Sequence, residues 1–530
     1  MKGGGIDFLG LRAVNLRMLA QFLLPGLNNA TRDFGNFCVA AWIPWKFHRT
    51  HQTKELFTEA RYAAFQERME IAMAHGIRWD GPGTAEFGNP HGRIGDRQQI
   101  EFPNSMRFST VSGRTKATSL FAAALYGPSM HYLGLLPGFY RSVDGERLTR
   151  IPAAGDDLAT RQMVEFVDIS IHSSPVAGRF LSPGFESATK EELEDVCVHG
   201  LNPPFYRTAP IAVKEAFLGK LFAPSEDGTP NPRLLTARLI RETLTQARGI
   251  SSVEMRRIWH TGLVSSATPF HAGDSDVVRQ RERWAIFQGR QIQRYVIETF
   301  LRVFELALAD GRRSIDSICD WTLKQAKATG GLIPKTFRDL VRAEGRAAGC
   351  PEDLDQATLH WNGTVCGDDI AYEWMDLESP ETEPARALRM LARWFIRARS
   401  WPEIFRAHTQ IHWDGANRIS LTWFVPWIEQ RMDWPLGAFL EEFFSELVFN
   451  QHLRTALSRF DGKIQRLRFL LGDEGIVPTG SSQGNLGKGE APWMADRLDA
   501  FVNLLSDLDV LEVGSSGGVL IGRNADFLLA

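Results

Sequence analysis

Residues 384–399 read PARALRMLARWFIRAR and form the clearest amphipathic segment of the chain. Four arginines in it lie three or four residues apart: Arg386, Arg389, Arg393 and Arg397. On an α-helix this spacing places all four on one side, which we call the arginine stripe. Apolar residues such as Leu391 and Phe395 fall on the opposite side. The segment therefore predicts a helix that packs through its apolar side and presents a basic one.

Guanidinium groups match phosphate oxygens, so the arginine stripe predicts contact with a nucleic-acid backbone without base readout. A second basic set follows in the sequence: Arg454, Arg459, Lys463, Arg466 and Arg468. Two alternatives stay open for the stripe. It is a solvated helix face, or it pairs with the acidic segment 350–383 that comes directly before it.

The composition is that of a globular protein with several domains. The chain has 530 residues, a net charge of −3 and a pI near 6.5. Its length predicts two to four domains, and its charge excludes indiscriminate coating of nucleic acid. Five scattered cysteines without a C-x-x-C pair indicate reduced thiols. The start MKGGGIDF does not resemble a secretory signal, and no apolar run is long enough to span a membrane, so we expect a cytoplasmic protein without membrane contact.

Helical periodicity dominates, so the predicted fold class is mainly α, with an irregular Gly/Pro-rich part and a small α/β end. We divide the chain as follows: an N-terminal helical unit (1–78), an irregular excursion (79–155), a central helical domain (156–349), an acidic connector (350–383), a basic helical domain (384–479), a flexible linker (480–491) and a winged-helix-like end (492–530). In the first unit a helix is expected to begin after Thr31 and to stop before Pro44. In the excursion a short helix is expected over 118–126.

The central domain carries a local excess of positive charge. Residues 233–302 contain 12 arginines and six acidic residues. A long helix over 277–309 is expected, with an apolar, buried second half over 296–308. Its first half carries Arg279, Arg281, Arg283, Arg290 and Arg294. The basic half is either a solvated face or part of an anion-binding surface.

The C-terminal residues predict a helix over 492–505, strands over 510–513 and 519–522, and a glycine-rich turn between them. A helix followed by such a hairpin is typical of a winged-helix module. A second hairpin is expected over 466–477.

No motif establishes a catalytic, metal or cofactor site. The Gly487-Lys488 loop departs from the phosphate-binding pattern at Ser482 and Gly489. Cys350, His360 and Cys366 lack the paired spacing of zinc ligands. Arg406 and His412 fit the loose arginine-to-histidine spacing of HEPN ribonucleases, in which histidine moves a proton and arginine steadies a phosphate.

Two parts of the chain resemble an uncharacterised bacterial protein family associated with multi-gene phage-defence loci. The residues that carry the resemblance are Leu9–Arg12, Leu23–Gly26, Asn28–Arg32, Trp42 and Gln451–Arg454. The resemblance implies a cytosolic partner in a larger defence assembly, alongside a helicase or a nuclease. It transfers no catalytic residue.

These observations favour a binding protein over an enzyme. The leading hypothesis is a non-enzymatic, DNA-binding or adaptor subunit of an anti-phage defence system. One alternative is a protein-interaction scaffold without nucleic-acid contact. The other is a HEPN-like ribonuclease centred on Arg406 and His412.

Overall fold

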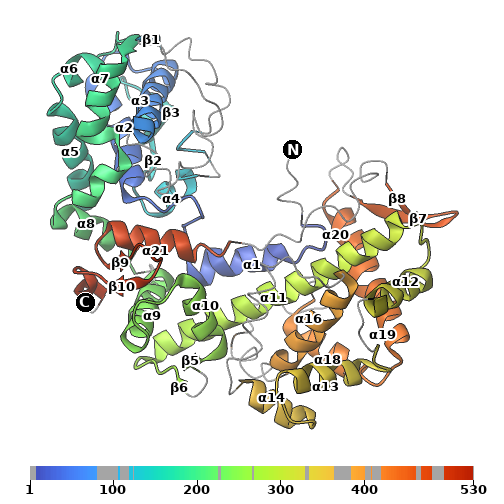
Figure 1. Ribbon diagram of the computed structural model, residues 1–530. Helices are drawn as coiled ribbons and strands as arrows, with labels where there is room; N and C mark the ends of the chain where they lie inside the picture. Colours follow the sequence, from blue (N-terminus) through green and yellow to red (C-terminus); the bar gives the residue numbers. More distant parts are fainter. Residues whose placement is uncertain are drawn as a thin grey trace. The chain divides into compact units, whose positions relative to one another are not determined.

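The computed structural model describes most of the chain. The described residues are 7–79, 105–107, 119–122, 125–224, 228–265, 268–328, 333–362, 383–399, 408, 419–460, 467–479 and 495–528. The model is 62% helix and 9% strand, with only small antiparallel sheets, so the mainly helical prediction is confirmed (Figure 1). No helix among these residues is long and apolar enough to cross a membrane.

The chain divides into two compact units. Unit 1 comprises Met1–Leu23, Thr245–Ala247 and Val253–Met494, and unit 2 comprises Leu24–Leu244, Arg248–Ser252 and Ala495–Ala530. The predicted central segment 156–349 contributes to both units. The predicted end 492–530 belongs mostly to unit 2, although it is far in sequence from the rest of that unit. The predicted linker 480–491 lies outside the described residues.

Unit 1 is built mainly from helices. Its elements are α1 (Arg12–Met18), η1 (Leu19–Leu23), α10 (Ser252–Thr261), β5 (Leu263–Ser265), β6 (Thr268–Pro269), α11 (Ser275–Ala309), α12 (Ile315–Ala328), α13 (Phe337–Ala347), α14 (Leu354–Asn362), α16 (Glu383–Ala398), α18 (Leu421–Glu429), α19 (Leu436–Phe443), η8 (Phe444–Asn450), α20 (Gln451–Ser458), β7 (Phe469–Gly472) and β8 (Gly475–Pro478).

The long helix α11 is the centre of unit 1, as expected. Asp274 caps its first turn by accepting a hydrogen bond from the Asp276 amide at 2.8 Å. From Trp284 to Val296 every side chain is buried, including the polar ones. Arg290 and Arg294 are among them, so this part of the predicted basic half is not a solvated face. Helices α1, α12 and α16 and the π-helix η8 pack on it (Figure 1).

Helix α16 is covered on several sides. It contacts α11, α12, α13 and α14, which come from different parts of the sequence. The indole of Trp394 donates to the Gly289 carbonyl of α11 at 3.3 Å. Both the apolar and the basic sides of α16 therefore have neighbours.

Unit 2 combines helices with short hairpins. Its elements are α2 (Phe34–Thr50), α3 (Glu59–Trp79), β1 (Ser105–Arg107), α4 (Gly127–Tyr132), β2 (Gly138–Arg141), β3 (Leu148–Ala153), α5 (Leu158–His172), α6 (Ala177–Phe180), β4 (Ser187–Thr189), α7 (Lys190–Val196), η5 (Cys197–Leu201), η6 (Pro203–Thr208), α8 (Ile211–Leu221), α9 (Pro232–Gln246, to residue 244 in this unit), α21 (Leu498–Asp507), β9 (Leu511–Val513), β10 (Val519–Ile521) and η9 (Ala525–Leu528).

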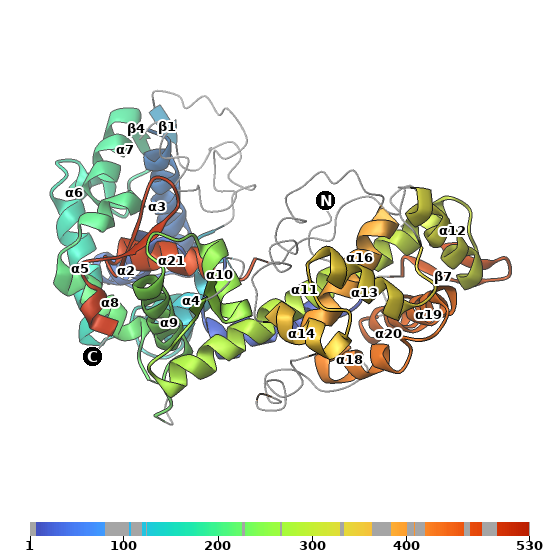
Figure 2. The same cartoon turned by 60° about the horizontal axis from the view of Figure 1, so that its bottom comes forward.

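Helix α2 lies in the core of unit 2, against α5 and near α3 (Figure 2). The prediction that this helix stops before Pro44 is wrong, because it continues to Thr50. Pro44 removes one backbone hydrogen bond, but residues 33–44 are all buried, so packing on both sides keeps the helix intact. Thr31 does not cap it. The Thr31 hydroxyl instead bonds the Asn28 backbone.

The predicted helix over 118–126 is also wrong where the chain is described. Residues 119–122 form turns, and helix α4 begins only at Gly127. Pro128 lies in its first turn, where its missing N–H costs nothing.

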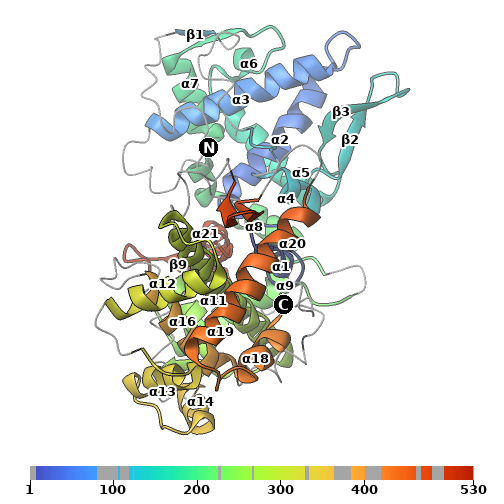
Figure 3. The ribbon, with the colours of Figure 1, turned by 90° about the vertical axis from the view of Figure 1, so that its right-hand side faces the viewer.

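Strands β2 and β3 form an antiparallel hairpin (Figure 3). Alternate residues point to opposite faces of a strand. On the inner face Tyr140 stacks on His48, with ring centroids 4.2 Å apart, and Ile151 is buried. On the outer face Phe139 and Leu148 are exposed.

Both predicted C-terminal hairpins form. Leu470 pairs with Val477 in β7–β8, and Leu520 pairs with Glu512 in β9–β10. Helix α21 precedes β9 directly. The order of helix and hairpin is confirmed, whereas the assignment to the winged-helix class stays a prediction.

Candidate functional site

The arginine stripe lies in a network of ion pairs inside unit 1. Arg389 and Arg393 donate to the two oxygens of Glu344 on α13, at 3.0 and 2.6 Å. Arg386 donates to Glu383 at 2.7 Å. Glu383 belongs to the predicted acidic connector, and Glu344 lies before it in the sequence.

Arg397 ends the stripe in a buried position. Its exposed fraction is 3%, and burial lowers the pKa of its guanidinium to about 9. Arg386 and Arg393 are buried as well, and Arg389 is partly exposed. The arginine stripe thus contacts carboxylates and neighbouring helices of its own unit. This arrangement fits pairing within the chain better than a solvated helix face.

The members of the second basic set have different surroundings in the structure. Arg459 binds Asp7 through its backbone oxygen and its carboxylate, the latter at 3.1 Å. Arg468 makes two bonds to Glu305 of α11, one of them at 2.8 Å. Arg454 is exposed, and Lys463 and Arg466 lie outside the described residues, as do Arg406 and His412.

A histidine helps to fasten the N-terminal segment to helix α20. The Arg468 amide donates to His452 Nε2 at 3.0 Å, so Nδ1 carries the proton and donates to the Phe8 carbonyl at 3.2 Å. Gln451 donates to the Leu9 carbonyl at 2.8 Å. The two sequence blocks Leu9–Arg12 and Gln451–Arg454 therefore meet in space.

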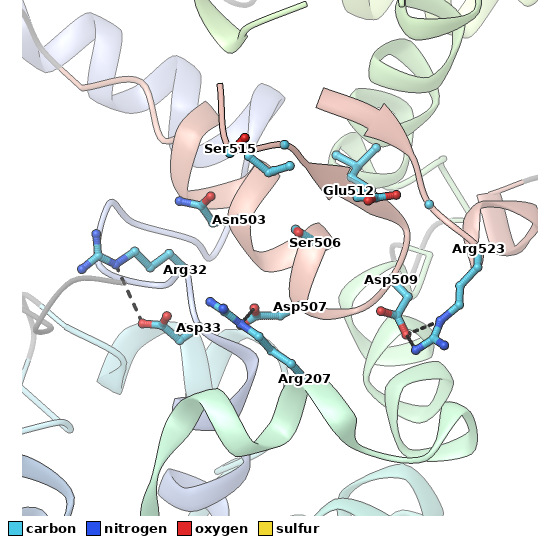
Figure 4. Close-up of a pocket in the computed structure, with 14 residues that line it drawn as sticks. Arg32, Asp33, Arg207, Asn503, Ser506, Asp507, Asp509, Glu512, Ser515 and Arg523 are labelled. Carbon is cyan, nitrogen blue, oxygen red and sulfur yellow. Dashed lines mark hydrogen bonds and ion pairs between the residues drawn. The ribbon is translucent and has the colours of Figure 1, made fainter. Parts of the chain in front are cut away.

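Unit 2 contains a polar cavity of about 630 Å³, which we call the C-terminal cavity. Helix α21 and the β9–β10 hairpin form one part of it, and the segment before α2 forms another (Figure 4). Its charged lining residues are Arg32, Asp33, Arg207, Asp507, Asp509, Glu512 and Arg523.

Two aspartates at the C-terminal end of α21, Asp507 in its last turn and Asp509 just beyond it, connect this segment to the rest of unit 2. Asp507 accepts from Arg207 Nε at 2.8 Å and from the Phe34 amide, at the start of α2, at 3.1 Å. Burial raises the pKa of Asp507, and Arg207 opposes this shift. Asp509, at a positive φ of 61°, accepts from the fully buried Lys214 at 2.8 Å and from Arg523 at 2.9 Å.

Arg32 is engaged less tightly than the other basic residues of the cavity. Its Nε lies 3.8 Å from Asp33 Oδ2, beyond hydrogen-bond distance, and has no hydrogen-bond partner among the described residues. Asp33 accepts a hydrogen bond from Asn36 at 3.1 Å instead. Sequence reasoning did not identify this cavity, because its charged residues come from segments hundreds of positions apart and follow no motif.

Comparisons with known proteins return no relative: no family model, no curated protein and no solved structure matches the chain.

Proposed function

We propose that this chain is a non-enzymatic adaptor subunit of a bacterial anti-phage defence assembly and binds a protein partner. The defence context comes from the resemblance of Leu9–Arg12 and Gln451–Arg454 to a family found in such loci. The arginine stripe does not carry this role, because its charges meet Glu344 and Glu383 within the chain. We therefore place partner binding on another surface.

The observation that carries the adaptor role is the outer face of the β2–β3 hairpin. Phe139 and Leu148 are 44% and 63% exposed, and Arg141 and Arg150 lie on the same face. Aromatic and arginine side chains are the residues that dominate binding energy at protein interfaces. Each strand of this two-stranded sheet also has one edge without a strand partner in the described part of unit 2.

The charge of this hairpin indicates the chemistry of its partner. Arg141, Arg147 and Arg150 are exposed, while Asp144 is held by Lys54 at 3.1 Å. Glu146 is the acidic residue left in the turn. An extended partner segment with alternating acidic and apolar residues fits this face by adding a strand to its edge.

The double variant Phe139→Ser/Leu148→Ser is expected to weaken partner binding strongly. Loss of two interface anchors of about 2 kcal/mol each weakens the Kd by about three orders of magnitude. The measurement is co-purification, then calorimetry, with the helicase- or nuclease-type proteins encoded beside the gene. The apolar anchors contribute affinity that changes little with salt, whereas the contribution of the exposed arginines is expected to weaken at high salt.

The matched control is Leu158→Ser/Ile169→Ser on α5 of the same unit, where both side chains are more than 70% exposed. It should leave the Kd unchanged. If both double variants lose the same affinity for the partner, or if the hairpin variant loses none, the hairpin is not the partner-binding surface.

A second candidate is backbone contact with DNA through the first half of α11. Arg279 is exposed, with its nearest carboxylate, Asp276, at 3.7 Å. Burial lowers the pKa of Arg283, the positive charge of Arg279 lowers it further, and Asp276 opposes the shift. Two neighbouring arginines with exposed or half-exposed side chains can contact adjacent phosphates of a polyanion.

Replacing both arginines by glutamine, as Arg279→Gln/Arg283→Gln, is expected to flatten the salt dependence of DNA binding. Each lost phosphate contact changes the slope of log K against log salt by about 0.9, so the slope becomes less steep by about 2. Mobility shifts at several salt concentrations measure it. Arg346→Gln, an exposed arginine of α13, is the control. An unchanged slope in the double variant would exclude this end of α11 as the DNA contact.

A further inference from the structure

The C-terminal cavity of unit 2 has Arg32 and Asp33 at one end and Glu512 toward the other. Figure 4 shows Arg32 and Glu512 on opposite sides of the view, with Asn503 and Ser506 of α21 between them. The other charged groups of the lining are largely occupied, because Asp507 pairs with Arg207 and Asp509 pairs with Lys214 and Arg523. Arg32, whose ion pair with Asp33 is long at 3.8 Å, and Glu512 are thus the charged groups of the lining that are least engaged within unit 2.

The Arg32 side is suited to a phosphate group. The Arg32 guanidinium is partly buried, and its Nε has no hydrogen-bond partner among the described residues. A buried arginine donor without a partner is unfavourable, and a bidentate anion relieves this cost. The hydroxyl of Ser506 and the amide of Asn503 add neutral donors next to it.

The Glu512 side is suited to a hydrogen-bond donor. Glu512 is exposed on β9, and no contact of its carboxylate is recorded among the described residues. Ser515, in the glycine-rich turn, also lines the cavity. A carboxylate accepts hydrogen bonds and repels a second anion, so the group bound here carries N–H donors rather than negative charge.

We propose that the C-terminal cavity binds a free nucleotide, with its phosphate at Arg32 and the amino group of its base at Glu512. A volume of about 630 Å³ falls within the range of small-molecule sites and exceeds what a lone phosphate fills. The proposal is independent of the adaptor role, because it uses none of the β2–β3 hairpin residues.

The test is isothermal titration calorimetry on the full chain with AMP, adenosine, inorganic phosphate and a 5′-phosphorylated oligonucleotide. AMP is expected to bind at least tenfold more tightly than either adenosine or phosphate. Arg32→Gln is expected to weaken AMP binding at least tenfold and to leave adenosine binding unchanged. Glu512→Gln is expected to weaken AMP and adenosine but not phosphate.

The control is Arg161→Gln, an exposed arginine on α5 of the same unit that does not line the cavity. Both cavity substitutions remove side chains with little internal bonding, and circular dichroism verifies that the variants are folded. Three results would overturn the proposal: no binding of AMP, phosphate binding as tightly as AMP, or preference for the oligonucleotide, which would make the cavity a site for a nucleic-acid end.

Discussion

Replacing Glu344 by alanine is expected to lower the free energy of unfolding of unit 1 by about 3 to 5 kcal/mol. Glu344 on α13 holds Arg389 at 3.0 Å and Arg393 at 2.6 Å, and its side chain and that of Arg393 are both about nine-tenths buried. Removing the carboxylate leaves the Arg393 charge buried beside Arg389 without this compensation. Breaking a buried pair costs far more than the net value of the pair, because the remaining charge stays desolvated.

Urea denaturation followed by tryptophan fluorescence measures this effect, since most tryptophans of the chain lie in unit 1. The matched control is Glu352→Ala, whose carboxylate pairs with Arg346 at 3.3 Å while both side chains stay largely exposed. That pair is expected to contribute less than about 1 kcal/mol. Glu344→Gln should lower the free energy of unfolding by an amount between those of the two alanine variants, because glutamine keeps an acceptor oxygen but loses the charge.

The same experiment decides between the two interpretations of the arginine stripe. If Glu344→Ala changes stability no more than the control, the arginines are hydrated without their carboxylate, and a polyanion can reach them. If stability falls as expected, the stripe is part of the internal packing of unit 1.

The arginine stripe shows which structural features helical periodicity in a sequence can predict and which it cannot. A spacing of three and four residues correctly predicts a helix and groups the arginines on one side. It does not show what covers that side. Glu344 lies 45 to 49 residues earlier, and only the packing of α13 against α16 brings it to the arginines. An ion pair over such a distance leaves no signal in one sequence.

Elements with strong local patterns were predictable, and sites assembled from distant segments were not. Helix α11 and the hairpins β7–β8 and β9–β10 follow from apolar periodicity and glycine turns. The Pro44 error has the opposite origin, because tertiary burial outweighed a local helix-breaking signal. The C-terminal cavity combines Arg32, Arg207 and Asp507, which no spacing rule connects.

Lowering the pH from 7 toward 4 is expected to weaken unit 1 through His452. The pKa of His452 is lowered from 6.5 to about 4, mainly by burial, while its bond to the Phe8 carbonyl opposes the shift and the charge of Arg468 adds to it. The neutral ring is required by the structure, because Nε2 accepts the Arg468 amide while Nδ1 donates to Phe8. Protonation at Nε2 removes that acceptor and places a second positive charge beside the Arg468 guanidinium.

The sign follows from proton binding. Unfolded chains take up the proton near pH 6.5, whereas the folded ring does so only near pH 4, so the unfolded state binds more protons between these values. The stabilisation is complete above about pH 6.5 and is lost as the pH falls to 4, by about 3 kcal/mol in total. Glu298, whose pKa burial raises to about 7, acts in the opposite direction over part of this range.

Because these two groups oppose each other, the comparison of His452→Gln with the unmodified chain is more informative than either pH profile alone. Glutamine can bond both Phe8 and Arg468 but does not titrate, so the free energy of unfolding of the unmodified chain should fall steadily relative to that of the variant as the pH drops from 6.5 to 4. His271→Gln, an exposed histidine of unit 1, should leave the profile unchanged. A difference that stays constant with pH would mean that His452 titrates alike in the folded and unfolded states, and the attachment of residues 7–9 to α20 would then not depend on a neutral ring.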